Sequence, residues 1–161
     1  MMESPVFEVS LHGTYGIVLP ERIVAPFLEA GQKRVEVFAR HAANEVRFHA
    51  ALQKRKGLYR LIFGKRHQKE LGIFPNDFFK IQLREDQTEF GVEIPEELGE
   101  TFRQWPEAYK AFLDLTEGSK RSVIYAISRY RTPQTRVEKA LQVGERLVQG
   151  VRKPRDLFKA E

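Results

Sequence analysis

Ser119 to Gly150 reads SKRSVIYAISRYRTPQTRVEKALQVGERLVQG. Apolar residues recur in this stretch every three or four positions, which predicts two amphipathic helices. Thr132 and Pro133 stand between them, and a threonine cap followed by proline at the first helical position is a typical helix start. Ser119, which follows Gly118, is the predicted cap of the first helix. The chain therefore ends in a helical unit.

The second of these helices carries a glycine on its apolar stripe. The residues of that stripe are Val137, Ala140, Leu141, Gly144, Leu147 and Val148. Because glycine in a helix interior costs about 1 kcal/mol relative to alanine, its presence needs a reason. We expect another helix to approach closely at Gly144.

The same stretch is basic. Its five cations between Gly118 and Val137, with no carboxylate among them, are Lys120, Arg121, Arg129, Arg131 and Arg136. A second run without a carboxylate holds eight cations, namely Arg47, Lys54, Arg55, Lys56, Arg60, Lys65, Arg66 and Lys69. A solvated face with internal ion pairing is the ordinary interpretation of such runs. The alternative is that the two runs converge on one face that attracts anions.

Upstream of Pro95 the apolar residues alternate with polar ones, as in half-buried strands. Six or seven short strands are predicted, the last over Phe90, Val92 and Ile94, and their spacing is typical of a small barrel. Short helices are predicted after Pro20 and around 66–71. The sequence thus predicts an α+β protein, with a small β-barrel over residues 1–94 and a domain of about four short helices over residues 95–161.

Several motifs resemble known domains. The helical part, with its Leu-Thr-x-Gly-x-x-Arg-Ser element at 115–122 and Pro-x-Thr-Arg at 133–136, resembles OmdA, the OmpD-associated or bacteriocin-protection domain. The N-terminal half resembles a small bacterial barrel domain of unknown function that commonly precedes OmdA. Its landmarks here are Val18-Leu19-Pro20, Lys33-Arg34-Val35, Gly57-Leu58-Tyr59, Leu71-Gly72-Ile73 and Ile94-Pro95. The resemblance implies a double-split, AbrB-like barrel and assigns no chemistry.

Composition excludes several kinds of site. The chain has no cysteine, so disulfides, thiol catalysis and thiolate metal sites are absent. Its four histidines, His12, His41, His49 and His67, show no metal-ligand spacing, and neither a phosphate-binding loop nor a nucleophile elbow occurs. We therefore expect no metal, no cofactor, no catalytic residue and no enzymatic activity.

The remaining hypothesis is a basic binding module. The net charge of +5 favours an anionic partner, either a nucleic acid or an acidic protein. Our candidates for anion binding are Arg60, Lys65, Arg66, Lys69, Lys120, Arg121, Arg131 and Arg136, with Tyr59, Tyr125 and Tyr130 as stacking residues. The alternative is a stress- or bacteriocin-tolerance protein that acts through protein–protein contacts, and an enzyme with unrecognised residues is the third hypothesis. The absence of a membrane span or signal peptide suggests a cytoplasmic protein. The resemblance to barrels that often pair implies a homodimer, for which the chain itself offers only strands that could lie at a sheet edge.

Overall fold

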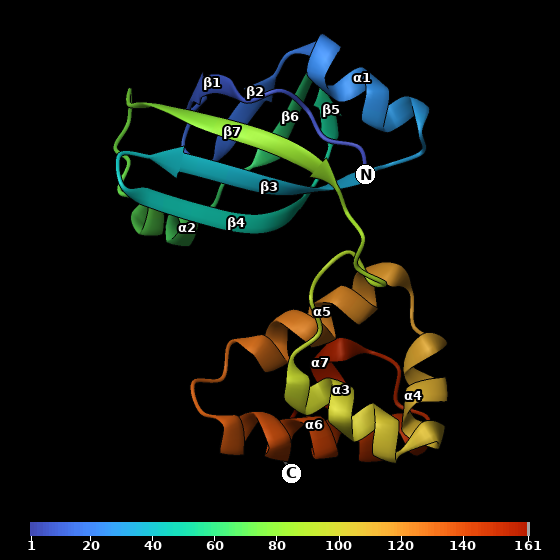
Figure 1. Ribbon diagram of the computed structural model, residues 1–161. Coiled ribbons are helices and arrows are strands. Elements are labelled where there is room, and N and C mark those ends of the chain that lie inside the picture. Colours follow the sequence, from blue (N-terminus) through green and yellow to red (C-terminus); the bar gives the residue numbers. More distant parts are fainter. Residues whose placement is uncertain (161) are drawn as a thin grey trace. The chain divides into compact units, whose positions relative to one another are not determined.

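The computed structural model describes residues 1–160 (Figure 1). Contacts between residues divide the chain into two compact units, the first ending at Gln87 and the second beginning at Thr88. The first unit contains β1 (Phe7–Ser10), β2 (Gly16–Leu19), α1 (Glu21–Glu29), β3 (Arg34–His41), β4 (Asn44–Ala51), β5 (Gln53–Arg55), β6 (Leu58–Ile62), α2 (Lys65–Leu71) and β7 (Phe78–Glu85). The second contains α3 (Glu96–Gln104), α4 (Pro106–Leu113), α5 (Glu117–Ser128), α6 (Pro133–Val148) and α7 (Pro154–Leu157).

The strands of the first unit form two antiparallel sheets. One has four strands in the order β1-β7-β3-β4, and the other has three in the order β2-β6-β5. The predicted mixture of strands followed by helices is confirmed. Within residues 1–160 no closed circuit of hydrogen-bonded strands joins the two sheets, so closure into a barrel is not confirmed, and the double-split type stays a prediction.

Alternating side chains divide the four-stranded sheet into a core face and a solvent face. On β3, Val35, Val37 and Ala39 are fully buried in the hydrophobic core of the first unit. Leu83 and Ile81 of β7 lie opposite Val37 and Ala39 in the register and are buried with them. Because successive residues of a strand point to opposite faces, the residues between these positions face solvent.

Both short helices predicted in the first unit are confirmed. α1 begins directly after Pro20, and α2 ends at Gly72, which adopts a left-handed conformation with φ of 76°. The buried side-chain amide of Gln68 donates hydrogen bonds to the carbonyls of Phe63 and Thr14, at 2.7 and 2.8 Å. These two bonds anchor α2 to the sheets.

The strand predicted over Phe90, Val92 and Ile94 does not form. Phe90 and Val92 are buried in the helical core of the second unit, where the ring of Phe90 meets Phe112 edge-on at 5.3 Å. Gly91 between them has φ of 79°, which an extended strand does not accommodate. The apolar alternation arises because a loop buries Phe90 and Val92 in the helical core. The first helix of the second unit begins at Glu96.

Among the described residues of the second unit, five helices pack around its core. Four match the prediction, and the fifth is the four-residue α7, whose Leu157 is fully buried. None of the helices in residues 1–160 combines the length and the apolar character that a membrane crossing requires.

Of the two helix caps predicted in the second unit, Thr132 is confirmed and Ser119 is wrong. Thr132 caps α6 by accepting a hydrogen bond from the backbone N–H of Thr135, as expected. α5, however, begins two residues before Ser119 and is capped by Thr116, whose hydroxyl accepts a hydrogen bond from the backbone N–H of Ser119 at 3.2 Å. Thr116 and Ser119 both carry a hydroxyl group that can cap a helix. Which of them is the cap depends on where the backbone becomes helical.

The predicted stripe of α6 is buried in part. The approach at Gly144 is confirmed, because a methyl group there would lie 2.8 Å from Cζ3 of Trp105. Ala140 and Leu147 are also buried. Val137, Leu141 and Val148, which the stripe placed in the core, are instead 39%, 50% and 37% exposed.

We predict that Gly144→Ala destabilises the protein by about 1–3 kcal/mol in urea unfolding, because the added methyl group overpacks the contact with Trp105. Gly118→Ala in α5 is the matched control, since no atom lies within 4 Å of its added carbon. That variant should be neutral or gain about 0.5–1 kcal/mol. Equal stability of the two variants would show that the close approach is not required.

Candidate anion-binding face

The first unit holds four of the predicted anion-binding residues on two elements. Arg60 lies on β6, with its guanidinium group directly over Gly16 of β2. The other three, Lys65, Arg66 and Lys69, are exposed on α2. Arg66 pairs with Glu70 at 3.1 Å on the helix surface.

The stacking candidate of this unit, Tyr59, is half-buried against the hydrophobic core. The ammonium group of Lys54 lies 5.2 Å from its ring centroid. Tyr59 therefore packs against the core on one side and makes a cation–π contact with Lys54.

The second unit separates its predicted residues along α5. Lys120 and Arg121 lie in the first turns of the helix, and Arg131 follows its end. At 1.5 Å per residue the seven positions from Arg121 to Ser128, where α5 ends, already span about 10 Å. Lys120 is only 8% exposed, and its ammonium group donates a hydrogen bond to Glu117 at 2.8 Å. This lysine therefore stabilises the helix start, and the cations of the run do not form one cluster.

Arg136 also has a structural role. Its guanidinium group donates hydrogen bonds to Glu97 and to the backbone carbonyl of Tyr130, both at 2.8 Å. Two hydrogen bonds lower the pKa of Glu97. The larger effect comes from the backbone N–H of Glu97 itself, and the smaller comes from the guanidinium group of Arg136. The two stacking candidates of the second unit differ in their surroundings. The ammonium group of Lys139 lies 5.6 Å from the ring centroid of Tyr130. Tyr125, on α5, is 42% exposed.

The lowered pKa of Glu97 generates a prediction about pH. A carboxylate with a depressed folded-state pKa contributes stability above its unfolded pKa and loses it as pH falls through the folded pKa. Glu97→Gln should therefore lower the melting temperature at pH 7, and the difference should vanish in acid. Glu145→Gln, an exposed change on α6, is the control and should alter the melting temperature little. A difference that persists in acid would contradict the ionic role.

The solvent face of the four-stranded sheet carries a cluster that the charge runs did not indicate. On β7 the outward residues are Phe78, Lys80, Gln82 and Arg84, and on β3 they include Phe38 and Arg40. The register places Phe38 opposite Gln82 and Arg40 opposite Lys80. The cluster could have been found from the sequence by listing the outward-facing residues that alternate with the buried ones along each strand.

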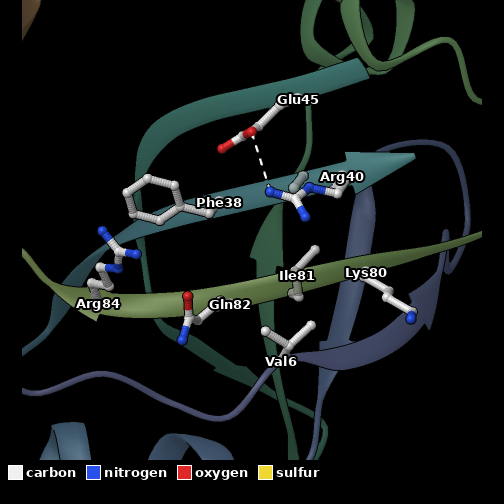
Figure 2. Close-up of a pocket in the computed structure, with 9 residues that line it drawn as sticks. Val6, Phe38, Arg40, Glu45, Lys80, Ile81, Gln82 and Arg84 are labelled. Atoms are coloured by element: carbon white, nitrogen blue, oxygen red, sulfur yellow. Dashed lines mark hydrogen bonds and ion pairs between the residues drawn. The ribbon is translucent and has the colours of Figure 1, made fainter. Parts of the chain in front are cut away.

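A shallow hollow of about 150 Å³ opens on this face (Figure 2). The guanidinium carbon of Arg84 lies 4.1 Å from the ring centroid of Phe38, and that of Arg47 lies 5.4 Å from the same ring. Arg40, Lys80 and Arg84 line the hollow, whereas Arg47 is not among its lining residues. Proteins that bind single-stranded nucleic acids use such a combination of an aromatic ring and cations: bases stack on the aromatic ring, and the cations contact the phosphates.

Carboxylates on the same surface hold these arginines in place. Arg40 pairs with Glu45 at 3.5 Å, and the two side chains are 70% and 54% exposed. Arg84 pairs with Glu3 at 3.1 Å. Exposed pairs of this kind contribute about 0–1 kcal/mol, so a phosphate can replace the carboxylate at small cost.

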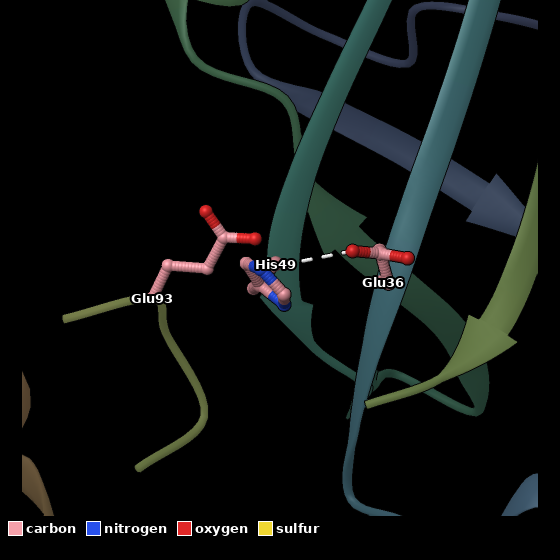
Figure 3. A group of neighbouring side chains, drawn as sticks. All are labelled: Glu36, His49 and Glu93. Carbon is pink, nitrogen blue, oxygen red and sulfur yellow. Dashed lines mark ion pairs between the residues drawn. The ribbon is translucent and has the colours of Figure 1, made fainter. Parts of the chain in front are cut away.

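The half-buried histidine of this sheet, His49, lies between two carboxylates. Figure 3 shows His49 of β4 beside Glu36 of β3, with Nε2 3.9 Å from the Glu36 carboxylate, while Nδ1 lies 3.3 Å from Asp86. Glu93, also drawn, belongs to the second unit. Because Glu36 and Asp86 approach opposite ring nitrogens, they cannot bind one metal ion together with this imidazole.

Another histidine, His67, stacks on Phe48 with 4.5 Å between ring centroids. Burial lowers its pKa below the usual value, with a smaller contribution from the positive charge of Arg66. This favours the neutral form near pH 7. His67 therefore supports packing around α2 and adds no positive charge to the surface.

Part of the second unit is similar to a known family. Residues 91–150 match the model of the OmdA family, described as "Bacteriocin-protection, YdeI or OmpD-Associated". No curated protein matches the chain. Among solved structures, the solution structure of PHS018 from Pyrococcus horikoshii is similar at 17% identity and a TM-score of 0.43, covering 55% of this chain and all of that one.

Proposed function

We propose that the protein is a non-enzymatic binding module and that the solvent face of the four-stranded sheet binds a polyanion, with single-stranded nucleic acid as the favoured ligand. The observation that carries this proposal is the stack of Arg84 on Phe38 in a hollow lined by Lys80 and Arg40. Guanidinium planes and aromatic rings both stack on nucleobases, and the two flanking cations suit phosphates. A sheet surface presents these groups without a recognition helix.

The size of the hollow supports binding in preference to catalysis. Pockets for small-molecule substrates usually enclose about 300–1,000 Å³, and the hollow beside Phe38 measures about 150 Å³. It suits one base or one phosphate of a longer ligand that lies across the sheet. The residues that line it include Glu45 as their only carboxylate, and that carboxylate is paired with Arg40.

The cations predicted from the sequence have a subordinate role in this proposal. Lys65 and Lys69 on α2 and Arg121 and Arg131 on the second unit extend the positive field that steers an anion toward the protein. Lys120 and Arg136 are held by Glu117 and Glu97 and contribute less. The convergence of the two basic runs on one face stays a prediction.

A second candidate function is bacteriocin tolerance through contact with another protein, as the OmdA description suggests. Trp105, Tyr109 and Phe112 are the aromatic residues that such a docking surface would use, and they differ in exposure. Phe112 is fully buried and belongs to the core, while Trp105 and Tyr109 are half-buried. The exposure of Val137 and Leu141 next to Trp105 favours this candidate.

Binding of a labelled single-stranded oligonucleotide of about 12 nucleotides, within the usual site size, tests the nucleic-acid proposal by fluorescence anisotropy. The triple variant Arg40→Gln, Lys80→Gln and Arg84→Gln should lose at least tenfold in affinity. Each lost phosphate contact lowers the salt dependence by about 0.7 in slope for single strands. The slope of log K against log salt should therefore fall by about 2.

The matched control removes the same charge from the three-stranded sheet and its turn. It carries Lys54→Gln, Arg55→Gln and Lys56→Gln, all exposed. This variant should keep the affinity of the wild type within a few-fold. Equal losses in both triple variants would reduce the effect to net charge, and no binding by the wild type at low salt would refute the proposal.

A further inference from the structure

The second unit contains a groove between α3 and α6 that is larger than the hollow beside Phe38. It measures about 630 Å³. Trp105 at the end of α3 forms part of its wall, with Val137 and Leu141 of α6 opposite the acidic residues of α3. All of the residues that line it belong to the second unit.

The apolar part of the groove is exposed. Val137 and Leu141 are 39% and 50% exposed, and their spacing of four residues places them on one side of α6. They stand beside the stripe that α6 buries through Ala140, Gly144 and Leu147. The helix therefore presents a second apolar strip that the second unit does not cover.

The groove is rigid at its base. Gly144 allows the ring of Trp105 to lie directly against α6. The ion pair between Arg136 and Glu97, at 2.8 Å, ties α6 to α3 a few turns away. Two fixed helices with an apolar floor give a surface that is formed before a partner arrives.

The polar rim of the groove is acidic, although the protein as a whole is basic. Glu96, Glu97 and Glu100 line it from α3, and no lysine or arginine is among its lining residues. Outside the lining, Arg136 pairs with Glu97 at 2.8 Å and Arg103 with Glu100 at 2.6 Å, so Glu96 contributes most to the negative charge of the rim. Hydrogen bonds lower the pKa of Glu97 and of Glu100, which receives them from Arg103 and Gln104. These carboxylates are ionised at neutral pH, and Glu96 is exposed to solvent.

We infer that this groove binds an amphipathic helix of a partner protein, with a row of leucine-like side chains flanked by lysine or arginine. The apolar row would lie on Val137, Leu141 and Trp105, and the cations would face the acidic rim of α3. Helices commonly bind in this way, with apolar anchors in a groove and charges that select the partner. This partner is basic, so the site is distinct from the anion-binding face.

A synthetic helical peptide tests the inference with the full-length protein. The probe has about 14 residues, or four helical turns, with leucines at positions i, i+3, i+4 and i+7 and lysines elsewhere. It should bind saturably at physiological ionic strength, measured by fluorescence anisotropy. A peptide with glutamate in place of every lysine should bind at least tenfold more weakly.

Variants of the groove locate the binding. Leu141→Asp should weaken the lysine peptide at least tenfold, and Glu96→Lys should weaken it several-fold. Val148→Asp and Glu145→Lys are the matched controls, because both residues are exposed on α6 and do not line the groove. They should bind as the wild type does. Leu141→Gln, a neutral change at the same half-exposed position, should also weaken binding and provides a second variant.

Three outcomes would overturn the inference. The first is equal binding of the two peptides, and the second is binding that the Leu141 and Glu96 variants leave unchanged. The third is a concentration-dependent dimer that Leu141→Asp abolishes, which would assign the groove to a second copy of the chain. The triple variant of the sheet face should bind the peptide normally, so failure of one proposal does not imply failure of the other.

Discussion

The core of the first unit depends on the strict alternation of β3. Val35, Val37 and Ala39 are completely buried, so the strand can adopt only one register. A slip by one residue would turn Phe38 and Arg40 into the core and expose the three apolar side chains. The positions of Phe38 and Arg40 on the solvent face are therefore a direct consequence of the burial on the other side. The proposed binding face is as well defined as the core beneath it.

Much of the fold could be predicted because its signals are local. Pro20 and Gly72 mark helix ends by backbone geometry alone, and Thr132 with Pro133 marks a helix start. The segment around Phe90 could not be predicted in this way. Its alternation resembles that of a strand, but a strand also requires a partner, and the residues that bury Phe90 come from helices far along the chain.

The candidate site was harder to predict than the fold. Charge runs direct attention to cations that are neighbours in sequence, and Lys120 shows the weakness of that approach, since it is buried against Glu117. Lys80 and Arg84 are separated by core residues, and Phe38 comes from another strand. Only the register between β3 and β7 brings them together. Conversely, the exposure of Leu141 could not be predicted from the apolar periodicity of α6. The periodicity identifies the apolar face of a helix, but it does not show how much of that face the neighbouring helices bury.

We assign two surfaces of opposite charge to the two units: a basic sheet face with a stacked ring, and an acidic groove between helices. Contact between nucleic acid and the sheet face can be tested by titrating the ¹⁵N-labelled protein with a single-stranded oligonucleotide and following the amide resonances. We expect saturable shifts at Phe38, Lys80 and Arg84, with the resonances of Lys54 and Arg55 unchanged. Shifts confined to α2 or to the ends of α5 would contradict this contact.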